Sequence, residues 1–274
     1  MAKEIWNRSG TSTKKLNIVA AARPIEFHGS WDIEDFDAFH ADLDGWIHRS
    51  TQSVIGLPSK SYIVSGLTDA FHQVYSVYNK IGIYHGEYGY HAKVFPNRVT
   101  HNLEDADIII ISHPFSADGL CSHKKIREAN KIGKPIFIDC AFFGICAGID
   151  FDFSPYKNIH SVGFSLSKTF GTGLQRVGLL YTNSVRYPVS VYGEWQYPLT
   201  ASAMYHYDLI KKIGPDDMYK KYRLQQEEIC DTIGAVPSDT VIFGLDYSDR
   251  YNHLRRGDVN RLCISKEFNV KDFS

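Results

Sequence analysis

A lysine in a short turn of small residues is the strongest chemical signal in the sequence. Lys168 stands in Ser165-Leu-Ser-Lys168-Thr-Phe-Gly171, and Arg176 follows eight positions later. Asp139 ends the apolar run Pro135-Ile-Phe-Ile-Asp139. A lysine that is desolvated near other positive charge has a lowered pKa and becomes an amine nucleophile or a base. Together the three side chains can supply a Schiff-base amine, a phosphate clamp and a counter-charge for a protonated ring nitrogen.

Each of these residues also has an ordinary structural explanation. A lysine is usually a solvated surface charge, and an aspartate at the end of an apolar run is most often a helix cap or a turn former. The segment Gly66-Leu67-Thr68-Asp69 lies at a predicted helix start, where backbone N–H groups attract phosphate, but the segment taken alone favours a plain Thr or Asp N-cap. A nucleotide-binding phosphate loop is excluded, because its Gly-Lys pair would need a glycine where Ser167 stands.

The segments around these residues alternate between strand and helix patterns. Strands are expected at residues 62–65, 80–84, 107–111, 135–139, 159–164 and 176–181, and helices at 70–80 and 122–131. This alternation predicts an α/β fold with a mostly parallel sheet and helices on both faces. Ligands of such sheets bind beyond the carboxyl ends of the strands, which is where we expect Asp139 and Ser165.

We predict one large domain and a reduced small one, because 274 residues are many for a single compact unit. The large domain would span residues 31–187, after an N-terminal arm or small-domain part at 1–30. Residues 188–274 would hold a remaining large-domain helix and a small α+β domain, with a helix at 216–233 and short strands at 241–245 and 261–265. The aromatic-rich stretch from Tyr192 to Tyr207 is a candidate dimer contact or part of the core.

Composition excludes several classes of protein. The formal net charge is -1 without a basic block, so nucleic acid and acidic membrane surfaces are poor partners, and we expect pairs such as Arg255-Arg256 on solvated faces. The five cysteines and twelve histidines are scattered, which indicates neither a disulfide framework nor a metal site. Without a signal peptide or a membrane-spanning run, we expect a cytoplasmic protein.

Residues Ser65 to Gly178 resemble the fold-type I pyridoxal phosphate enzymes of the class I/II aminotransferase family. The signature Ser-x-Ser-Lys-x-x-Gly-x-x-x-x-Arg-x-Gly runs from Ser165 to Gly178, and Asp139 lies at a suitable distance before it. A further match lies near Arg261. The resemblance implies the three-layer large domain of that fold, pyridoxal 5'-phosphate as the cofactor, and a homodimer with a shared active site.

The resemblance also implies a role for each matching residue. Lys168 would form the Schiff base and later carry a proton, and Asp139 would pair with the ring nitrogen. Tyr88 would stack on the ring with Tyr90 in reserve, although either tyrosine also suits packing. Arg261 would bind the substrate carboxylate, unless it is a surface charge at a strand edge. The other implied cofactor contacts are Leu67, Thr68, Ser116, Ala141, Ser165 and Arg176.

Two positions depart from the family pattern. Phe142 stands where the family usually has a tyrosine that donates to the cofactor's phenolic oxygen. Ser116, in His113-Pro-Phe-Ser116, replaces an asparagine that contacts the same oxygen. The chain is also shorter than typical members, so the small domain is expected to be pared down.

Three classes of function therefore stay open. The first is amino-group transfer between an amino donor and a keto-acid or aldehyde acceptor, in primary metabolism or in a biosynthetic cluster. The second keeps the cofactor but breaks another bond at Cα, as in decarboxylation, elimination, racemisation or carbon–carbon bond formation. The third is a non-catalytic subunit that binds the cofactor or a partner, beside the remote case of an α/β domain without a cofactor.

Overall fold

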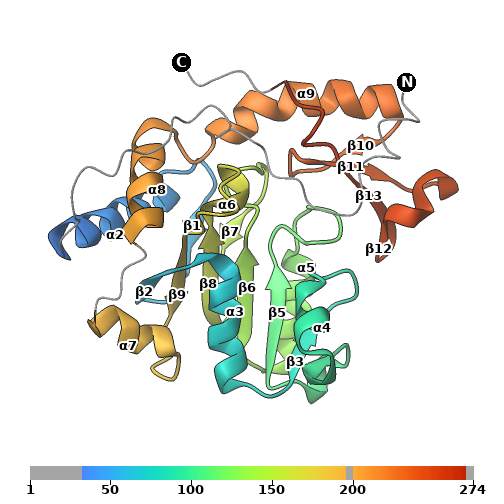
Figure 1. The fold of residues 1–274 in the computed structure, drawn as a ribbon. Coiled ribbons are helices and arrows are strands. Elements are labelled where there is room, and N and C mark those ends of the chain that lie inside the picture. The colour runs from blue at the N-terminus through green and yellow to red at the C-terminus, as the bar shows by residue number, and fades with distance from the viewer. Residues whose placement is uncertain (1–32, 196–199, 270–274) are drawn as a thin grey trace.

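The structure is a computed structural model that describes residues 33–195 and 200–269 (Figure 1). A seven-stranded sheet lies at its centre, in the order β2-β9-β8-β6-β5-β3-β4. Its strands are β2 (Ser61–Val64), β3 (Ile81–Ile83), β4 (Val99–Thr100), β5 (Ile108–Ser112), β6 (Ile136–Cys140), β8 (Ile159–Ser165) and β9 (Gly178–Thr182). Strand β9 is antiparallel to both of its neighbours, and the other pairs are parallel. The prediction of a mostly parallel sheet is confirmed.

Helices cover both faces of this sheet. The helices are α2 (Ile33–His48), α3 (Gly66–Val77), α4 (Tyr90–Val94), α5 (His123–Ile132), α6 (Leu166–Thr169), α7 (Pro188–Trp195), α8 (Thr200–Lys212) and α9 (Asp217–Ile233). Ile109 belongs to an apolar cluster with Phe39 of α2, whereas Ile110 belongs to a second cluster with Phe71 of α3. Successive strand residues point to opposite faces, so β5 is buried on both sides and the predicted three layers are confirmed.

The carboxyl ends of the parallel strands bring distant residues together. Ser112, the last residue of β5, pairs in register with Asp139 of β6, and Asp139 in turn pairs with Gly163 of β8. Strand β8 continues directly into α6, which carries Lys168. The sheet therefore positions the aspartate and the lysine at one edge, as ligand sites of such sheets require.

Helix α3 begins earlier than the sequence predicts. We expected it at residue 70, but it starts at Gly66, which places Leu67 and Thr68 in its first turn. The Ser65 N–H donates to Asp69 Oδ2 at 3.0 Å, so the aspartate closes the start of the helix although no side chain of Ser65 caps it. The first turn of α3 follows the carboxyl end of β2, which lies at the same sheet edge as the end of β8 because Val64 and Ser165 both pair with Gly178.

A second, antiparallel sheet lies at the carboxyl-terminal side, in the order β10-β11-β13-β12. Its strands are β10 (Val236–Pro237), β11 (Phe243–Asp246), β12 (Arg255–Arg256) and β13 (Val259–Cys263). Helix α9 packs against it, and Gln226 Nε2 donates to the carbonyl oxygen of Phe243 at 2.7 Å. A short two-stranded sheet joins β1 (Val54–Ile55) to β7 (Phe151–Asp152). The domain boundaries stay predictions, and the arm expected at residues 1–30 lies outside the described residues.

Two further predictions meet the same limits. The aromatic-rich stretch from Tyr192 to Tyr207 falls on α7 and α8, with residues 196–199 outside the described part. Within residues 33–195 and 200–269, no helix has both the length and the apolar character that crossing a bilayer requires.

Candidate active site

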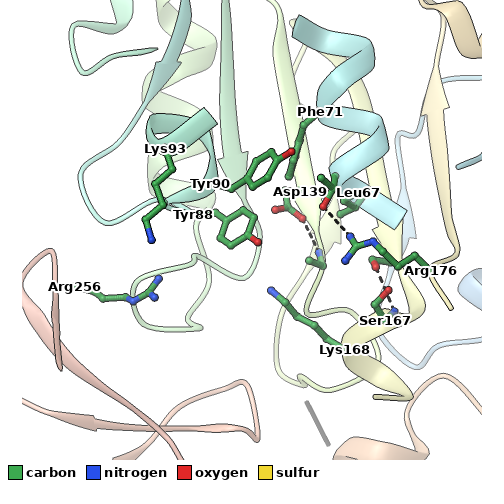
Figure 2. A pocket seen from close by; sticks show the side chains of 14 residues that line it. Leu67, Phe71, Tyr88, Tyr90, Lys93, Asp139, Ser167, Lys168, Arg176 and Arg256 are labelled. Atoms are coloured by element: carbon green, nitrogen blue, oxygen red, sulfur yellow. Dashed lines mark hydrogen bonds between the residues drawn. The ribbon is translucent and has the colours of Figure 1, made fainter. Parts of the chain in front are cut away.

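A cavity of about 450 Å³ opens at the carboxyl ends of β6 and β8 (Figure 2). Side chains from five separate segments line it: the start of α3, the turn before α4, the end of β6, the turn around α6, and β12 of the small sheet. Lys168, Asp139 and Arg176 all line this one cavity, together with Thr68. The predicted lysine, aspartate and arginine therefore meet in space although 37 residues of sequence separate Asp139 from Arg176.

Lys168 enters the cavity from the helical turn that follows β8. Ser165 caps this turn, because its Oγ accepts from the Ser167 N–H at 3.3 Å. The Lys168 side chain is half-buried, and its Nζ lies 3.7 Å from the centroid of the Phe142 ring and 5.7 Å from that of Tyr88. Burial lowers the pKa of Lys168 to about 8, against the opposing charge of Asp139. An amine of this kind is partly neutral near pH 8 and can act as a nucleophile.

Asp139 lies at the end of β6 with 4% of its surface exposed. Its Oδ1 accepts a hydrogen bond from the Ala141 N–H at 2.9 Å. Burial raises the pKa of Asp139 to about 6, and the Lys168 charge and this N–H only partly offset the effect. A buried carboxylate that is charged at neutral pH favours a cationic ligand group beside it.

Arg176 joins the start of α3 to the turn after α6. Its Nη2 donates to Thr68 Oγ1 at 2.8 Å, and its Nε donates to the Ser65 carbonyl oxygen at 3.3 Å. Gly66 has a φ of +69°, which strains any other residue, and a Cβ there would lie 2.9 Å from Arg176 Nη2 and would shift the guanidinium. The guanidinium and the helix amino end together form an anion site.

The remaining predicted contacts on this side also line the cavity. Leu67, Ala141 and Ser165 are all buried lining residues. Ser167 lies beside them, and its buried Oγ has no hydrogen-bond partner among the described residues. A buried hydroxyl without a partner is costly, so the Ser167 Oγ is a free group that a ligand oxygen would satisfy.

Two tyrosines form the opposite wall. The Tyr88 and Tyr90 rings stack with centroids 5.9 Å apart and planes 11° from parallel. Glu87 holds the backbone here, because its Oε1 accepts from the Tyr88 N–H at 2.8 Å and its Oε2 accepts from the Ser112 N–H at 2.9 Å. Burial raises the pKa of Glu87 to about 7. The sequence analysis missed this residue, since a lone glutamate in a Gly- and Tyr-rich segment gives no signal of burial.

Ser116 and Arg261 are not among the residues that line the cavity. Arg261 is 6% exposed, its Nη1 donates to the Ser116 carbonyl oxygen, and its guanidinium carbon lies 4.4 Å from the centroid of the Phe243 ring. The positive charge of Arg261 still lowers the pKa of Lys168. Arg261 is therefore near the lysine and bound to a carbonyl through Nη1, while its buried Nε has no hydrogen-bond partner among the described residues. The roles suggested for Arg261 and Ser116 stay predictions.

Arg256 corrects one expectation. The pair Arg255-Arg256 was expected on a solvated face, but Arg256 is half-buried and lines the cavity, while Arg255 is exposed. The two side chains point in opposite directions because they are neighbours on one strand, β12. Lys93 of α4 lines the cavity as well. Arg256 reaches the cavity through the long-range pairing of the small sheet, so the local sequence pattern does not predict its position.

Three potential metal ligands approach one another elsewhere. The ligand atoms of His113, Cys121 and His123 lie within 4.8 Å of one another. However, the Nε2 atoms of both histidines lie within hydrogen-bond distance of the Asp150 carbonyl oxygen, at 2.8 and 2.6 Å. Burial also lowers the pKa of His113 to about 3. These nitrogens already have protein partners, and the expectation that no metal is bound stays a prediction.

Comparison with known proteins gives matches at the level of structure. No protein-family model matches the chain, and no curated protein sequence matches it. Among solved structures, an aromatic aminotransferase from Pyrococcus horikoshii matches with a TM-score of 0.61 and 12% identity, over 80% of this chain and 71% of the other. The chain has the fold of this aminotransferase.

Two further structures with this aminotransferase fold are similar to the chain. A histidinol-phosphate aminotransferase from Sinorhizobium meliloti, in complex with pyridoxal-5'-phosphate, matches with a TM-score of 0.55 and 14% identity, over 82% of this chain and 69% of the other. An L-threonine-O-3-phosphate decarboxylase from Porphyromonas gingivalis matches with a TM-score of 0.55 and 12% identity, over 74% of this chain and 80% of the other. The fold thus carries both transamination and decarboxylation in these neighbours.

Proposed function

We propose that this chain is a pyridoxal phosphate-dependent aminotransferase. The observation that carries the proposal is the meeting of Lys168, Asp139 and Arg176 in one cavity of about 450 Å³. The fold adds support, because one neighbour with it was crystallised with pyridoxal-5'-phosphate and several neighbours are aminotransferases. The substrates would be an amino donor and a keto-acid or aldehyde acceptor.

The residues that line the cavity fit this cofactor from end to end. Arg176, Thr68 and Ser165, with the α3 amino end at Leu67, would hold the phosphate, and the unpartnered Ser167 Oγ would add a fourth polar group. Asp139 would hold a protonated ring nitrogen beside Ala141, and Tyr88 would cover one face of the ring. Pyridoxal phosphate supplies an electron-withdrawing ring that stabilises negative charge at the substrate Cα.

The amine of Lys168 has two tasks in this proposal. With a pKa of about 8, it provides a neutral amine for covalent attachment of the cofactor at mildly alkaline pH. The same Nζ would also be placed to accept a proton from the substrate Cα and to return it, as a general base and then a general acid. Asp139 supports both steps, because its carboxylate favours the protonated ring nitrogen.

A second candidate reaction follows from Phe142. This residue places an apolar ring 3.7 Å from Lys168 Nζ, at the position where the resemblance implies a tyrosine hydroxyl. Ser116 lies outside the cavity lining, so the contacts of the cofactor's phenolic oxygen would differ from the family pattern. The alternatives are other chemistry at Cα, such as decarboxylation, or a non-catalytic subunit of the same fold. The proposal also includes a homodimer with a shared active site and a location in the cytoplasm. It further assigns cofactor contacts to Ser116 and, in reserve, to Tyr90, and a substrate contact to Arg261.

Visible absorption spectroscopy tests the proposal directly. Pyridoxal phosphate added to the purified chain should give a visible band, which Lys168→Ala abolishes and Lys131→Ala, a change on the exposed face of α5, preserves. For an aminotransferase, an amino acid then bleaches the band and a keto acid restores it. Release of carbon dioxide without restoration favours the second candidate. The absence of any band from protein with native circular dichroism would overturn the assignment.

A further inference from the structure

The charges that line the cavity do not balance. Four cationic side chains line it, from Lys93, Lys168, Arg176 and Arg256, against the single carboxylate of Asp139. The proposed function uses Lys168 for the cofactor and Arg176 for its phosphate. Lys93 and Arg256 are left over, and neither side chain makes a hydrogen bond or an ion pair with another residue in the part of the chain that the structure describes.

Both remaining cations point into the same part of the cavity. Figure 2 shows Lys93 descending from α4 and Arg256 reaching in from β12, on the side of Tyr88 that lies away from Arg176. Arg256 is half-buried, and burial lowers the pKa of its guanidinium. A partly desolvated guanidinium without a partner is unfavourable, and an anion placed between it and an ammonium removes that penalty.

Arg261 does not fill this role. Its guanidinium lies over Phe243 and bonds to the Ser116 carbonyl, and its charge acts on Lys168 more strongly than that of Arg256 does. A substrate carboxylate near Lys168 would be attracted by the positive charge of Arg261, although Arg261 itself does not line the cavity. A second anionic group further along the same substrate would reach Lys93 of helix α4 and Arg256 of strand β12.

We propose that Lys93 and Arg256 bind the anionic end of the substrate side chain, so that the amino substrates of this protein are acidic. This inference rests on the proposed function, and it narrows the substrate class to amino compounds that carry a second carboxylate or a phosphate. Arg256 offers a planar fork that binds either group in a bidentate manner, and Lys93 offers a point charge beside it. Both are specificity residues that contact the substrate away from the reacting atoms.

Binding of unreactive probes to the cofactor-loaded protein tests the inference. We expect calorimetry to show that glutarate binds at least tenfold more tightly than butyrate, which lacks the second carboxylate. Arg256→Gln and Lys93→Gln should each weaken glutarate binding about tenfold and leave butyrate unchanged. Arg255→Gln is the matched control, because Arg255 is the exposed neighbour on the same strand. Comparing glutarate with 4-phosphonobutyrate distinguishes a carboxylate from a phosphate.

Steady-state kinetics provide the second measurement. The ratio of kcat/KM for L-glutamate over L-glutamine, or for L-aspartate over L-asparagine, should fall at least tenfold in Arg256→Gln and stay constant in Arg255→Gln. A normal visible band with equal glutarate affinity in wild type, Arg256→Gln and Lys93→Gln would overturn this inference alone. If no band forms, the proposed function fails, and the inference fails with it.

Discussion

Lys168 Nζ lies 3.7 Å from the centroid of the ring of Phe142, a residue that follows Asp139 by three positions in the sequence. A ring face attracts an ammonium group, so Phe142 favours the charged lysine. Burial has the opposite effect, and it is the main cause that lowers the pKa of Lys168 from 10.5 to about 8. The ring face and the burial of the amine therefore act on the lysine pKa in opposite directions.

Replacing this ring should lower the lysine pKa further. In the cofactor-free protein, Phe142→Leu removes the ring face, and we expect the pKa of Lys168 to fall by about one unit. The pH dependence of acylation at Lys168, followed by peptide mass spectrometry, measures it. Phe142→Tyr keeps the ring face and serves as the control. An unchanged or higher pKa in Phe142→Leu would show that the ring does not stabilise the charge.

The buried carboxylate of Asp139 should make cofactor-free protein less stable at neutral pH. Its folded pKa of about 6 lies above the ordinary 3.8, so the folded state binds more protons and stability falls as pH rises from about 4 to 6. Asp139→Asn removes the charge and keeps an oxygen for the Ala141 N–H. We expect the variant to be more stable at pH 7 by up to about 3 kcal/mol, but not at pH 4.

Urea unfolding at the two pH values measures this difference. Glu104→Gln is a suitable control, because that carboxylate is exposed. With pyridoxal phosphate bound, the wild type should be more stable than Asp139→Asn at pH 7, since the wild-type carboxylate then has a cationic partner. An equal effect of Asp139→Asn at pH 4 and pH 7 would contradict the raised pKa.

Glu87 should stabilise the wall that carries Tyr88. Its two oxygens accept from the Tyr88 and Ser112 N–H groups, and an amide has only one accepting end. Glu87→Gln should therefore place the side-chain NH₂ group against one of these two backbone N–H groups and destabilise the protein by about 1–3 kcal/mol. Because the pKa of Glu87 is about 7, the wild type loses stability as pH rises toward 7, and the deficit of the variant should be larger at pH 6 than at pH 8. Urea unfolding of both proteins checks this; a deficit that grows with pH would refute it.

The sequence predicts the half of the site that lies on regular elements. Asp139 ends an apolar strand and Lys168 follows the next one, and the carboxyl ends of parallel strands meet at one edge. The lysine signature with its glycines adds Arg176. These residues are predictable because local pattern and sheet topology together fix their positions.

The other half depends on contacts between distant segments. Arg256 reaches the cavity only because β12 pairs with β13 in a sheet whose strands are as short as two residues. Glu87 is buried by Ser112, which lies 25 residues further along the chain. Neither burial follows from a residue's neighbours in sequence. From sequence alone, two adjacent arginines are therefore expected on a solvated surface, and only the arrangement of the small sheet shows that Arg256 lines the cavity.

The last prediction concerns Gly66, the first residue of α3. A Cβ at Gly66 would lie 2.9 Å from Arg176 Nη2 in a backbone with a φ of +69°, so Gly66→Ala brings both backbone strain and displacement of the guanidinium. Gly133→Ala is the matched control, because its φ is +81° and no atom lies within 4 Å of the added Cβ. Both variants should lose about 1–3 kcal/mol of stability in urea unfolding.

Only Gly66→Ala should weaken the affinity for pyridoxal phosphate, by about tenfold or more, because the guanidinium that bonds to Thr68 belongs to the proposed phosphate site. Titration of the visible band gives both affinities. Comparable affinity losses in the two variants would mean that backbone strain alone, and not the position of Arg176, controls binding.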